Sequence, residues 1–244
     1  TDVSHHPGEF ERVFETQVAG VRMRAPMMSI HTVAAGGGSF LHFDGARFRV
    51  GPDSAGANPG PACYRRGGPL TVTGGNLMLG KIQPRYFPPV FGPHGDAPLD
   101  AQVVKDKFEE LKNRISDGRR PEQIAEGFVQ IAVGNMANAI KHISVQRGHD
   151  VTQYTLCSFG GAAGQHACLV ADTLAMKRVF IHPHAGVLSA YGMGLADQLA
   201  MRERAVEARL DETLDLARIA SDLAAAARED LVSQGVAPQR VRIV

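Results

Sequence analysis

The chain has 244 residues, 44% of them hydrophobic, and its 26 lysines and arginines nearly balance 25 aspartates and glutamates, leaving a net charge of +1. That is enough apolar material for a buried core, and the lack of a charged block argues against nucleic acid or anionic lipid as a partner. Three widely spaced cysteines, Cys63, Cys157 and Cys168, argue against a disulfide framework and a CxxC metal site. No apolar run reaches the roughly 18 residues of a membrane span. We therefore expect a soluble, cytoplasmic protein.

The first 70 residues have the character of strands and turns. Residues 12–24 and 40–50 each predict two short strands around a turn, and Asp44-Gly45 supplies the positive φ of a tight hairpin. The next stretch, 51–69, is rich in Gly and Pro, which predicts an irregular loop. Loops of this length in compact domains are usually functional or disordered. Its aromatic and cysteine residues favour an ordered loop.

Two helices follow. Residues 99–115 carry Val103, Val104, Phe108, Leu111 and Ile115 at helical spacing, with Asp100 available as a cap. Residues 121–148 predict a longer helix, opened by a proline and closed by a glycine. Because this second helix is apolar on more than one face, we expect it to be largely buried.

The last part of the chain alternates between strand and helix patterns. Residues 154–159 predict a short buried strand, 164–176 a helix, 178–183 another strand, 186–201 a helix and 212–235 a final amphipathic helix. Strand, helix, strand at this spacing implies a parallel pair joined by a right-handed crossover. The sequence therefore predicts α/β architecture.

A glycine cluster follows the first of these strands, in the sequence SFGGAAGQHAC. Ligands of α/β sheets bind beyond the carboxyl ends of the strands, and glycines let a backbone approach a phosphate closely. On the other hand, glycine-rich turns between strand and helix are common, and a GG-x-x-G without a Lys or Ser/Thr tail is a weak signal. From the residues alone, a nucleotide cradle and a packing turn both stay open.

Four stretches together resemble the hydantoinase/oxoprolinase family: TDVS, HTVAAGGGSFLHFDGARFRVGPDSAGANPGPACYRRGGPLTVT, FGGAAGQHAC and IHPHAGVLSAYGMGLAD. The QHAC that follows the glycines resembles the 5-oxoprolinase branch. The resemblance implies an actin-like (ribonuclease H-like) ATPase lobe, with a parallel or mixed sheet flanked by helices and a hairpin-rich N-terminal region. TDVS then resembles the tail of the second phosphate loop and FGGAAG the adenosine motif. No first phosphate loop is found, and the chain begins at Thr1, so we expect a second lobe from a longer protein.

The lobe is expected to have a strand- and loop-rich part (1–98), a helical part (99–150) and an α/β part (151–244). The implied reaction is hydrolysis of 5-oxo-L-proline to L-glutamate, driven by ATP with Mg²⁺. The implied partners are 5-oxoproline or a related cyclic amide, the remaining lobes of the parent chain, and further copies in a homo-oligomer. Alternatives are an ATP-dependent hydantoinase, a ketone carboxylase subunit, or a non-catalytic binding lobe. We expect the isolated piece to be inactive.

The resemblance also implies roles for particular residues. Asp2 is expected to act at the metal, although an Asp beside Thr is ordinarily a cap or turn residue. His166 is a candidate catalytic group, against the alternative of a packing histidine, and Asp53 and Asn58 are catalytic candidates, against the alternative of turn caps. The expected cofactor-binding residues are Gly36, Gly37, Gly38, Ser39, Gly160, Gly161, Ala162, Gly164 and Gln165. The triple glycine serves equally well where two backbones cross closely.

One stretch departs from the family pattern. Family members usually carry Asp-Ala-Asn where this chain has Gly74-Gly75-Asn76. If that aspartate takes part in the chemistry, this chain is impaired or uses another group. We expect a helix over 76–82, with the two glycines weakening its start.

Overall fold

The structure is a computed structural model that describes residues 1–8, 11–18, 20–209 and 214–244, with the backbone alone at positions 12, 14, 17, 18, 25 and 26. Contacts between Cα atoms divide the chain into two compact units, Thr1–Leu188 and Ser189–Val244. In the described part of the first unit six strands come first, three α-helices follow, and a strand, a helix and a strand end the series; the second unit is helical, so the fold is mixed α/β. No helix among the described residues is both long enough and apolar enough to span a bilayer.

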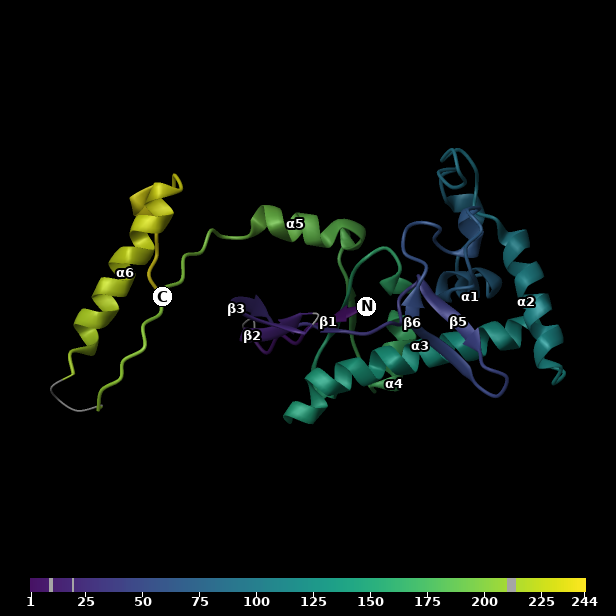
Figure 1. Ribbon diagram of the computed structural model, residues 1–244, viewed down its shortest axis with the longest axis horizontal. Coiled ribbons are helices and arrows are strands. Elements are labelled where there is room, and N and C mark those ends of the chain that lie inside the picture. The colour runs from purple at the N-terminus through teal and green to yellow at the C-terminus, as the bar shows by residue number, and fades with distance from the viewer. Residues whose placement is uncertain (9–10, 19, 210–213) are drawn as a thin grey trace. The chain divides into compact units, whose positions relative to one another are not determined.

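Four small sheets of two strands each carry all the strands of the described chain (Figure 1). Three of the sheets are antiparallel: β1 (Asp2–Val3) with β4 (His31–Thr32), β2 (Arg12–Val18) with β3 (Val21–Met28), and β5 (Ser39–Phe43) with β6 (Phe48–Ser54). The hairpins predicted over 12–24 and 40–50 are confirmed, and Gly45 has the predicted positive φ, at 98°. The Asp44 carboxylate accepts hydrogen bonds from the Ala46 and Arg47 amides, which fixes this turn.

The fourth sheet is the predicted parallel pair. β7 (Leu156–Ser158) lies beside β8 (Val179–Ile181), and α4 (Ala167–Thr173) connects them. The prediction of a buried strand is wrong, because Cys157 and all three residues of β8 are exposed. Parallel strands are normally covered by further strands and helices, and this pair has one uncovered edge on each strand within the described chain. The larger sheet expected for the lobe is therefore present here only as pairs of strands.

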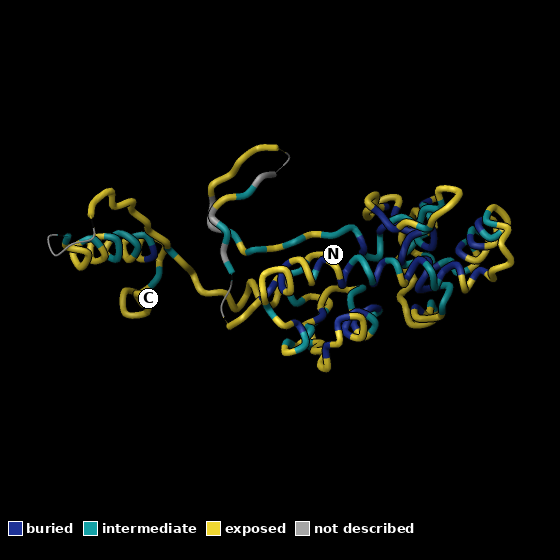
Figure 2. Tube along the Cα trace, turned by 90° about the horizontal axis from the view of Figure 1, so that it is seen from below, coloured by how far each residue is buried: buried dark blue, intermediate teal, exposed yellow. Residues whose placement is uncertain are grey.

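Helix α3 (Pro121–Ile143) organises the core of the first unit and contacts α1 (Val72–Met78), α2 (Ala101–Ile115), α4 and β6 (Figure 1). Its N-terminal half packs into one hydrophobic cluster through Ile124, Ala125 and Phe128, together with residues of α1 and α2. Its C-terminal half packs into a second cluster through Val133 and Met136, together with residues of α4. The predicted burial of this helix on more than one face is confirmed, and its buried residues are dark blue in Figure 2.

Helix ends agree with the sequence in part. The Asp100 side chain accepts hydrogen bonds from the amides of Gln102 and Val103 at 3.0 Å, so it caps α2 as predicted. Pro121 opens α3 as predicted, but the α-helix ends at Ile143 and the chain continues as a 3₁₀ turn over Val145–Arg147 that Gly148 closes at φ 87°. The predicted helix over 121–148 thus combines a long α-helix and a short 3₁₀ turn.

Helix α1 corrects the expectation for 76–82. It spans Val72–Met78, so Gly74 and Gly75 lie inside it. Both glycines are buried: a Cβ at Gly75 would lie 3.4 Å from Val129 Cγ2, and one at Gly74 would lie 3.5 Å from Leu70 Cδ2. Close packing of Gly75 against α3, and of Gly74 against Leu70 and α2, holds the glycines in the helix although their propensity is low.

The later helices are shorter than predicted. The stretch 164–176 forms a 3₁₀ turn over Ala163–Gln165 followed by α4. The stretch 186–201 contains α5 (Leu188–Leu195), which ends soon after two low-propensity glycines. The final helix α6 spans Leu216–Ser233 with Asp215 as its cap, and part of the predicted start at 212 lies outside the described residues. In the described part of Ser189–Val244, Leu231 is the one buried hydrophobic residue.

Candidate functional site

The first glycine segment, residues 36–39, connects β4 to β5 and is closely packed. The Ser39 amide donates to the Gly36 carbonyl at 2.9 Å, and the Thr73 amide of α1 donates to the Gly37 carbonyl at 2.9 Å. A Cβ at Gly37 would lie 2.7 Å from Thr73 Oγ1, and one at Gly38 would lie 3.0 Å from Ser54 Oγ. A side chain at 37 would therefore displace the Thr73 hydroxyl, and one at 38 would require a small shift of the Ser54 hydroxyl.

The second glycine segment, residues 160–165, leaves the carboxyl end of β7, as predicted. Gly160 has a left-handed φ of 95° and donates its amide to the Ala185 carbonyl at 2.8 Å, which ties this turn to the chain after β8. Gly161 is exposed, its φ is not positive, and a Cβ there would meet no atom within 4 Å among the described residues. The backbone at Gly161 is therefore open to a ligand.

The two glycine segments, residues 36–39 and 160–165, meet although they are far apart in the sequence, and we call their meeting point the glycine junction. A Cβ at Gly37 would lie 3.6 Å from the Cβ of Ala162. Thr73, from the first turn of α1, lies against Gly37 through both its amide and its hydroxyl. The structure thus brings two of the predicted cofactor-binding stretches together and adds the N-terminal turn of α1, which the sequence did not indicate as part of the site.

A buried polar network holds this junction. Asn76 of α1 is fully buried, and its Nδ2 lies 2.7 Å from Oε1 of Gln165 and 2.8 Å from Nε2 of His166. Asn76 was not predicted as a site residue. In the sequence Asn76 is a single polar residue within an apolar stretch. Nothing near it indicates its two partners, which lie some 90 residues later in the chain.

His166 is held by this network in a neutral form. His166 is 2% exposed. This burial, together with the nearby positive charge of Lys81, lowers the pKa of its imidazole to about 4. With Asn76 Nδ2 as the donor, His166 Nε2 is the acceptor, so the ring proton sits on Nδ1. This environment favours a positioning role for His166 over proton transfer at neutral pH.

Asp2 lies on β1, opposite Thr32 on β4. The Thr32 hydroxyl donates to Asp2 Oδ1 at 2.6 Å, and both residues are exposed. The neighbouring Thr1 leads toward the first glycine segment, since a Cβ at Gly36 would lie 3.4 Å from Thr1 Oγ1. Asp2 is therefore an exposed carboxylate on the strand pair that precedes the glycines.

Asp53 borders the first glycine segment through its neighbour Ser54, but its own side chain points away from that segment. Asp53 belongs to strand β6, not to a loop, and its side chain is 67% exposed with Oδ2 at 3.7 Å from His42 Nε2. The next residue, Ser54, is the one that faces Gly38, and successive side chains of a strand point to opposite faces. Asn58 is exposed in the segment that follows. The structure therefore places the Ser54 side chain, and not that of Asp53, against the first glycine segment.

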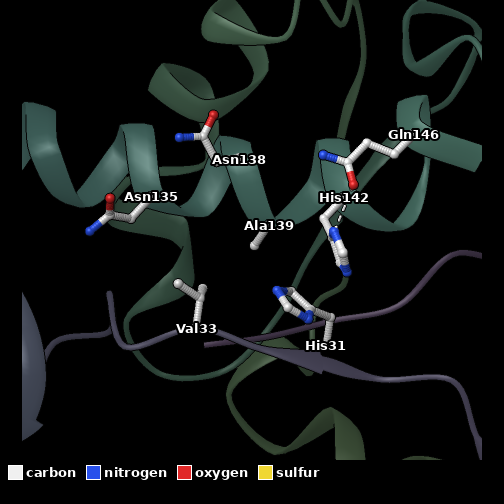
Figure 3. Close-up of a pocket in the computed structure, with 7 residues that line it drawn as sticks. All are labelled: His31, Val33, Asn135, Asn138, Ala139, His142 and Gln146. Atoms are coloured by element: carbon white, nitrogen blue, oxygen red, sulfur yellow. Dashed lines mark hydrogen bonds between the residues drawn. The ribbon is translucent and has the colours of Figure 1, made fainter.

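A separate polar pocket of about 330 Å³ lies between β4 and the C-terminal half of α3 (Figure 3). Its lining residues are His31, Val33, Asn135, Asn138, Ala139, His142 and Gln146. The His31 and His142 rings lie 4.6 Å apart, and His142 Nδ1 is 2.8 Å from Gln146 Oε1. Because His31 and Val33 face the pocket, the Thr32–Asp2 pair lies on the other face of the strand pair. The pocket and the glycine junction are different sites.

Comparison with known proteins decides the family. The family model described as Hydantoinase/oxoprolinase matches residues 1–202. The chain belongs to the hydantoinase/oxoprolinase family. The resemblance drawn from the sequence is therefore confirmed over more than four fifths of the chain.

Relatives in this family include 5-oxoprolinases. The chain is 49% identical to 5-oxoprolinase 1 of Arabidopsis thaliana over 207 residues and 49% identical to the 5-oxoprolinase of Saccharomyces cerevisiae over 202 residues. Each match covers 81% of this chain and 16% of the relative. A more distant relative, caprolactamase subunit alpha of Pseudomonas jessenii, is 36% identical over 203 residues, which is 81% of this chain and 28% of the relative. The chain thus spans about a sixth of the length of these 5-oxoprolinases.

Two solved structures share the fold of this hydantoinase/oxoprolinase chain. The ATP-dependent caprolactamase from Pseudomonas jessenii matches with a TM-score of 0.67 and 32% identity, covering 91% of this chain and 32% of that one. Acetone carboxylase in a nucleotide-free structure matches with a TM-score of 0.70 and 23% identity, covering 93% and 32%. The second match bears on the fold alone. Both neighbours, like the 5-oxoprolinases, are far longer than this chain.

Proposed function

We propose that this chain forms one wall of an ATP site in a longer enzyme that hydrolyses a cyclic amide, with 5-oxo-L-proline as the substrate. The observation that carries the proposal is the meeting of the two glycine segments at Gly37 and Ala162, beside the first turn of α1. Exposed backbone at Gly161 admits a phosphate or ribose group closely because no side chain covers it. The high identity to proteins named 5-oxoprolinase supports the choice of substrate.

We also propose that the chain is the second lobe of an actin-like ATPase. The parallel β7–α4–β8 unit, with glycines at the carboxyl end of β7, is the kind of element that binds nucleotides in such sheets. The free strand edges of the described sheets are available for pairing with strands from the remaining chain. The short share of each relative that the chain covers supports a parent chain with further lobes.

ATP in this scheme supplies the phosphoryl group that turns a poor amide electrophile into one that water attacks. The residues of this chain bind and orient. The backbone of Gly160, Gly161 and Gly164 borders the nucleotide, Gln165 and His166 hold the turn in place through Asn76, and Gly36–Ser39 form the facing turn. Such positioning and electrostatic stabilisation is the main contribution of proteins to phosphoryl transfer.

Asp2 is the proposed ligand for Mg²⁺. An exposed carboxylate suits this ion, which is usually held by one or two carboxylates together with waters and substrate phosphates. The Thr32 hydroxyl on Oδ1 fixes the orientation of the carboxylate. Asp53 and Asn58 stay candidates for contact with the substrate, since both are exposed and available to a facing lobe.

A second candidate is a lobe that binds nucleotide without turnover. The observation that favours it is the pair Gly74-Gly75 in place of the usual Asp-Ala. A Cβ at Gly74 would point at Leu70 and Val104, so the missing carboxylate belongs to the packed side of α1. Position 74 therefore faces the packed side of α1 and not the exposed backbone at Gly161.

The test measures ATP hydrolysis and substrate consumption by the full-length polypeptide that carries this chain, with 5-oxoproline, hydantoin and caprolactam as alternative substrates. The proposal predicts ADP release coupled to loss of 5-oxoproline, and no turnover by residues 1–244 alone. Faster turnover of hydantoin or caprolactam would show that 5-oxoproline is not the preferred substrate, while still supporting ATP-dependent hydrolysis of a cyclic amide. Saturable ATP binding with no turnover of any of the three would establish the non-catalytic lobe.

A further inference from the structure

A second cluster of polar side chains lies away from the glycine junction, where the connection after β1 meets the end of α3. His5 follows β1, Glu11 precedes β2, and His149 follows the 3₁₀ turn after α3. One donor atom from each of the three lies within 4.8 Å of the others. No pattern in the sequence predicted this cluster, because His149 is distant along the chain from the other two.

His5 is the buried member of the cluster. It is 8% exposed, and its ring centroid lies 4.2 Å from that of His149 and 4.8 Å from that of Tyr154. Tyr154 in turn packs against the second hydrophobic cluster, with Val151. The imidazole is therefore buried, and an unsatisfied polar atom is costly in such a place.

The two nitrogens of His5 have different surroundings. Nδ1 lies 2.7 Å from Glu11 Oε1, so the carboxylate orients the ring. In the neutral tautomer that donates from Nδ1 to this carboxylate, the lone pair of the ring is on Nε2. Nε2 is buried and has no hydrogen-bond partner among the described residues. A carboxylate on one nitrogen of a histidine and an unmet lone pair on the other is the arrangement that metal-binding histidines adopt.

We propose that His5, Glu11 and His149 form a site for one divalent transition-metal ion such as Zn²⁺. His5 binds through Nε2 and His149 through a ring nitrogen, while Glu11 holds the His5 ring in the required tautomer and supplies negative charge. Imidazole nitrogens favour Zn²⁺ over Mg²⁺. The remaining coordination positions are open to water.

The geometry requires a modest rearrangement. Two ligands of a tetrahedral Zn²⁺ with bonds of about 2.0–2.1 Å lie roughly 3.4 Å apart. One ligand-capable atom of each residue lies within 4.8 Å of the other two, so rotation of the more exposed His149 side chain has to bring its nitrogen within bonding distance of an ion on His5 Nε2. Arg147 already binds the other carboxylate oxygen, with Nη1 at 2.7 Å from Glu11 Oε2, which keeps Glu11 in place during that closure.

The ion has a structural role in this arrangement. It ties the segment that enters the β2–β3 hairpin to the chain that follows α3, alongside the Arg147–Glu11 ion pair. The site does not depend on the proposed activity, since neither histidine belongs to the glycine junction.

The experiment titrates Co²⁺ and Zn²⁺ into the metal-stripped full-length polypeptide and follows the visible absorption of tetrahedral Co²⁺. Variants His5→Gln and His149→Gln each remove a nitrogen donor, and Glu11→Gln keeps the shape but removes the charge. His94→Gln is the matched control, because it removes an exposed histidine outside the cluster. Circular dichroism verifies that each variant is folded.

We expect loss of the tetrahedral absorption in His5→Gln and His149→Gln. Glu11→Gln should weaken Zn²⁺ binding by about 10–100-fold, as loss of an outer-shell partner does, and His94→Gln should behave as wild type. If His5→Gln does not fold, His149→Gln decides, since its ring is less buried. An absence of tetrahedral Co²⁺ absorption in the wild type, or equal Zn²⁺ affinity in wild type and folded His149→Gln, would overturn the proposal.

Discussion

Gly37 lies against Ala162, so that a Cβ added to the glycine would come within 3.6 Å of the Cβ of the alanine. This contact joins the turn after β4 to the turn after β7. Each segment alone is interpretable as a simple packing turn, and at this contact the two meet to form the proposed nucleotide site.

The first prediction separates ligand contact from backbone strain at the second glycine segment. Gly161→Val places its side chain in open space, so the melting temperature should stay within about 2–4 °C of wild type, while ATP affinity falls because the valine occupies the ligand's path. Gly160→Val is the matched variant. Its φ of 95° disfavours a side chain, so stability should fall by at least about 1 kcal/mol. If folded Gly161→Val binds ATP as tightly as wild type, the turn does not contact the nucleotide and serves only in packing.

The second prediction concerns Asn76. Asn76→Leu keeps a similar volume but removes the donor that Gln165 and His166 share, leaving two polar atoms unpaired. Each buried unpaired atom costs about 1–3 kcal/mol, so the midpoint of urea unfolding should drop. The exposed Asn138→Leu serves as the control and should leave the midpoint nearly unchanged. If the two variants show equal midpoints, the network does not hold the turn.

The third prediction follows from the pKa of His166, about 4 in the folded chain against 6.5 ordinarily. Between these values the unfolded chain binds the proton and the folded chain does not, so this residue's contribution to stability is complete above pH 6.5 and is lost as the pH falls toward 4. The loss is on the order of 3 kcal/mol. Urea unfolding of wild type and His166→Gln at pH 7.5 and pH 5 measures it: the stability difference between them should shrink at pH 5. A difference independent of pH would mean that His166 is not held neutral by burial.

The fourth prediction concerns the glycine pair in α1. Gly75→Ala removes a low-propensity residue from a helix interior, worth up to about 1 kcal/mol, while its Cβ fits 3.4 Å from Val129 Cγ2. Gly134→Ala in α3 is the control, since a Cβ there meets nothing within 4 Å among the described residues and reports propensity alone. We expect both to raise the melting temperature, Gly75→Ala by the smaller amount. A lower melting temperature for Gly75→Ala would show that α1 cannot tolerate the extra methyl group.

Local signals in the sequence located most elements of the fold. Asp44-Gly45 specified its hairpin, Asp100 its helix cap, and the glycines after Ser158 the turn at the end of β7, because each acts through neighbours only a few residues away. Helix α1 was misplaced because its two glycines are tolerated only through packing against Val129 and Leu70, which no local pattern reveals.

The site was predictable in part for the same reason. The glycine segments were found from their composition and from the family resemblance. Their meeting, the part played by Thr73 and Asn76, and the burial of His166 all depend on contacts between distant segments. Asp53 was expected in a loop, but the strand pairing of Ser39 with Ser54 extends β6 through it.

The most direct test of the central claim is photoaffinity labelling of the full-length polypeptide with azido-ATP, followed by mapping of the labelled peptides. If the two glycine segments form one nucleotide site, label should appear in peptides containing residues 36–39 and 158–166, and excess ATP should abolish it in both. Label that ATP displaces from one of these peptides but never reaches the other, or that lies only outside both, would contradict the account.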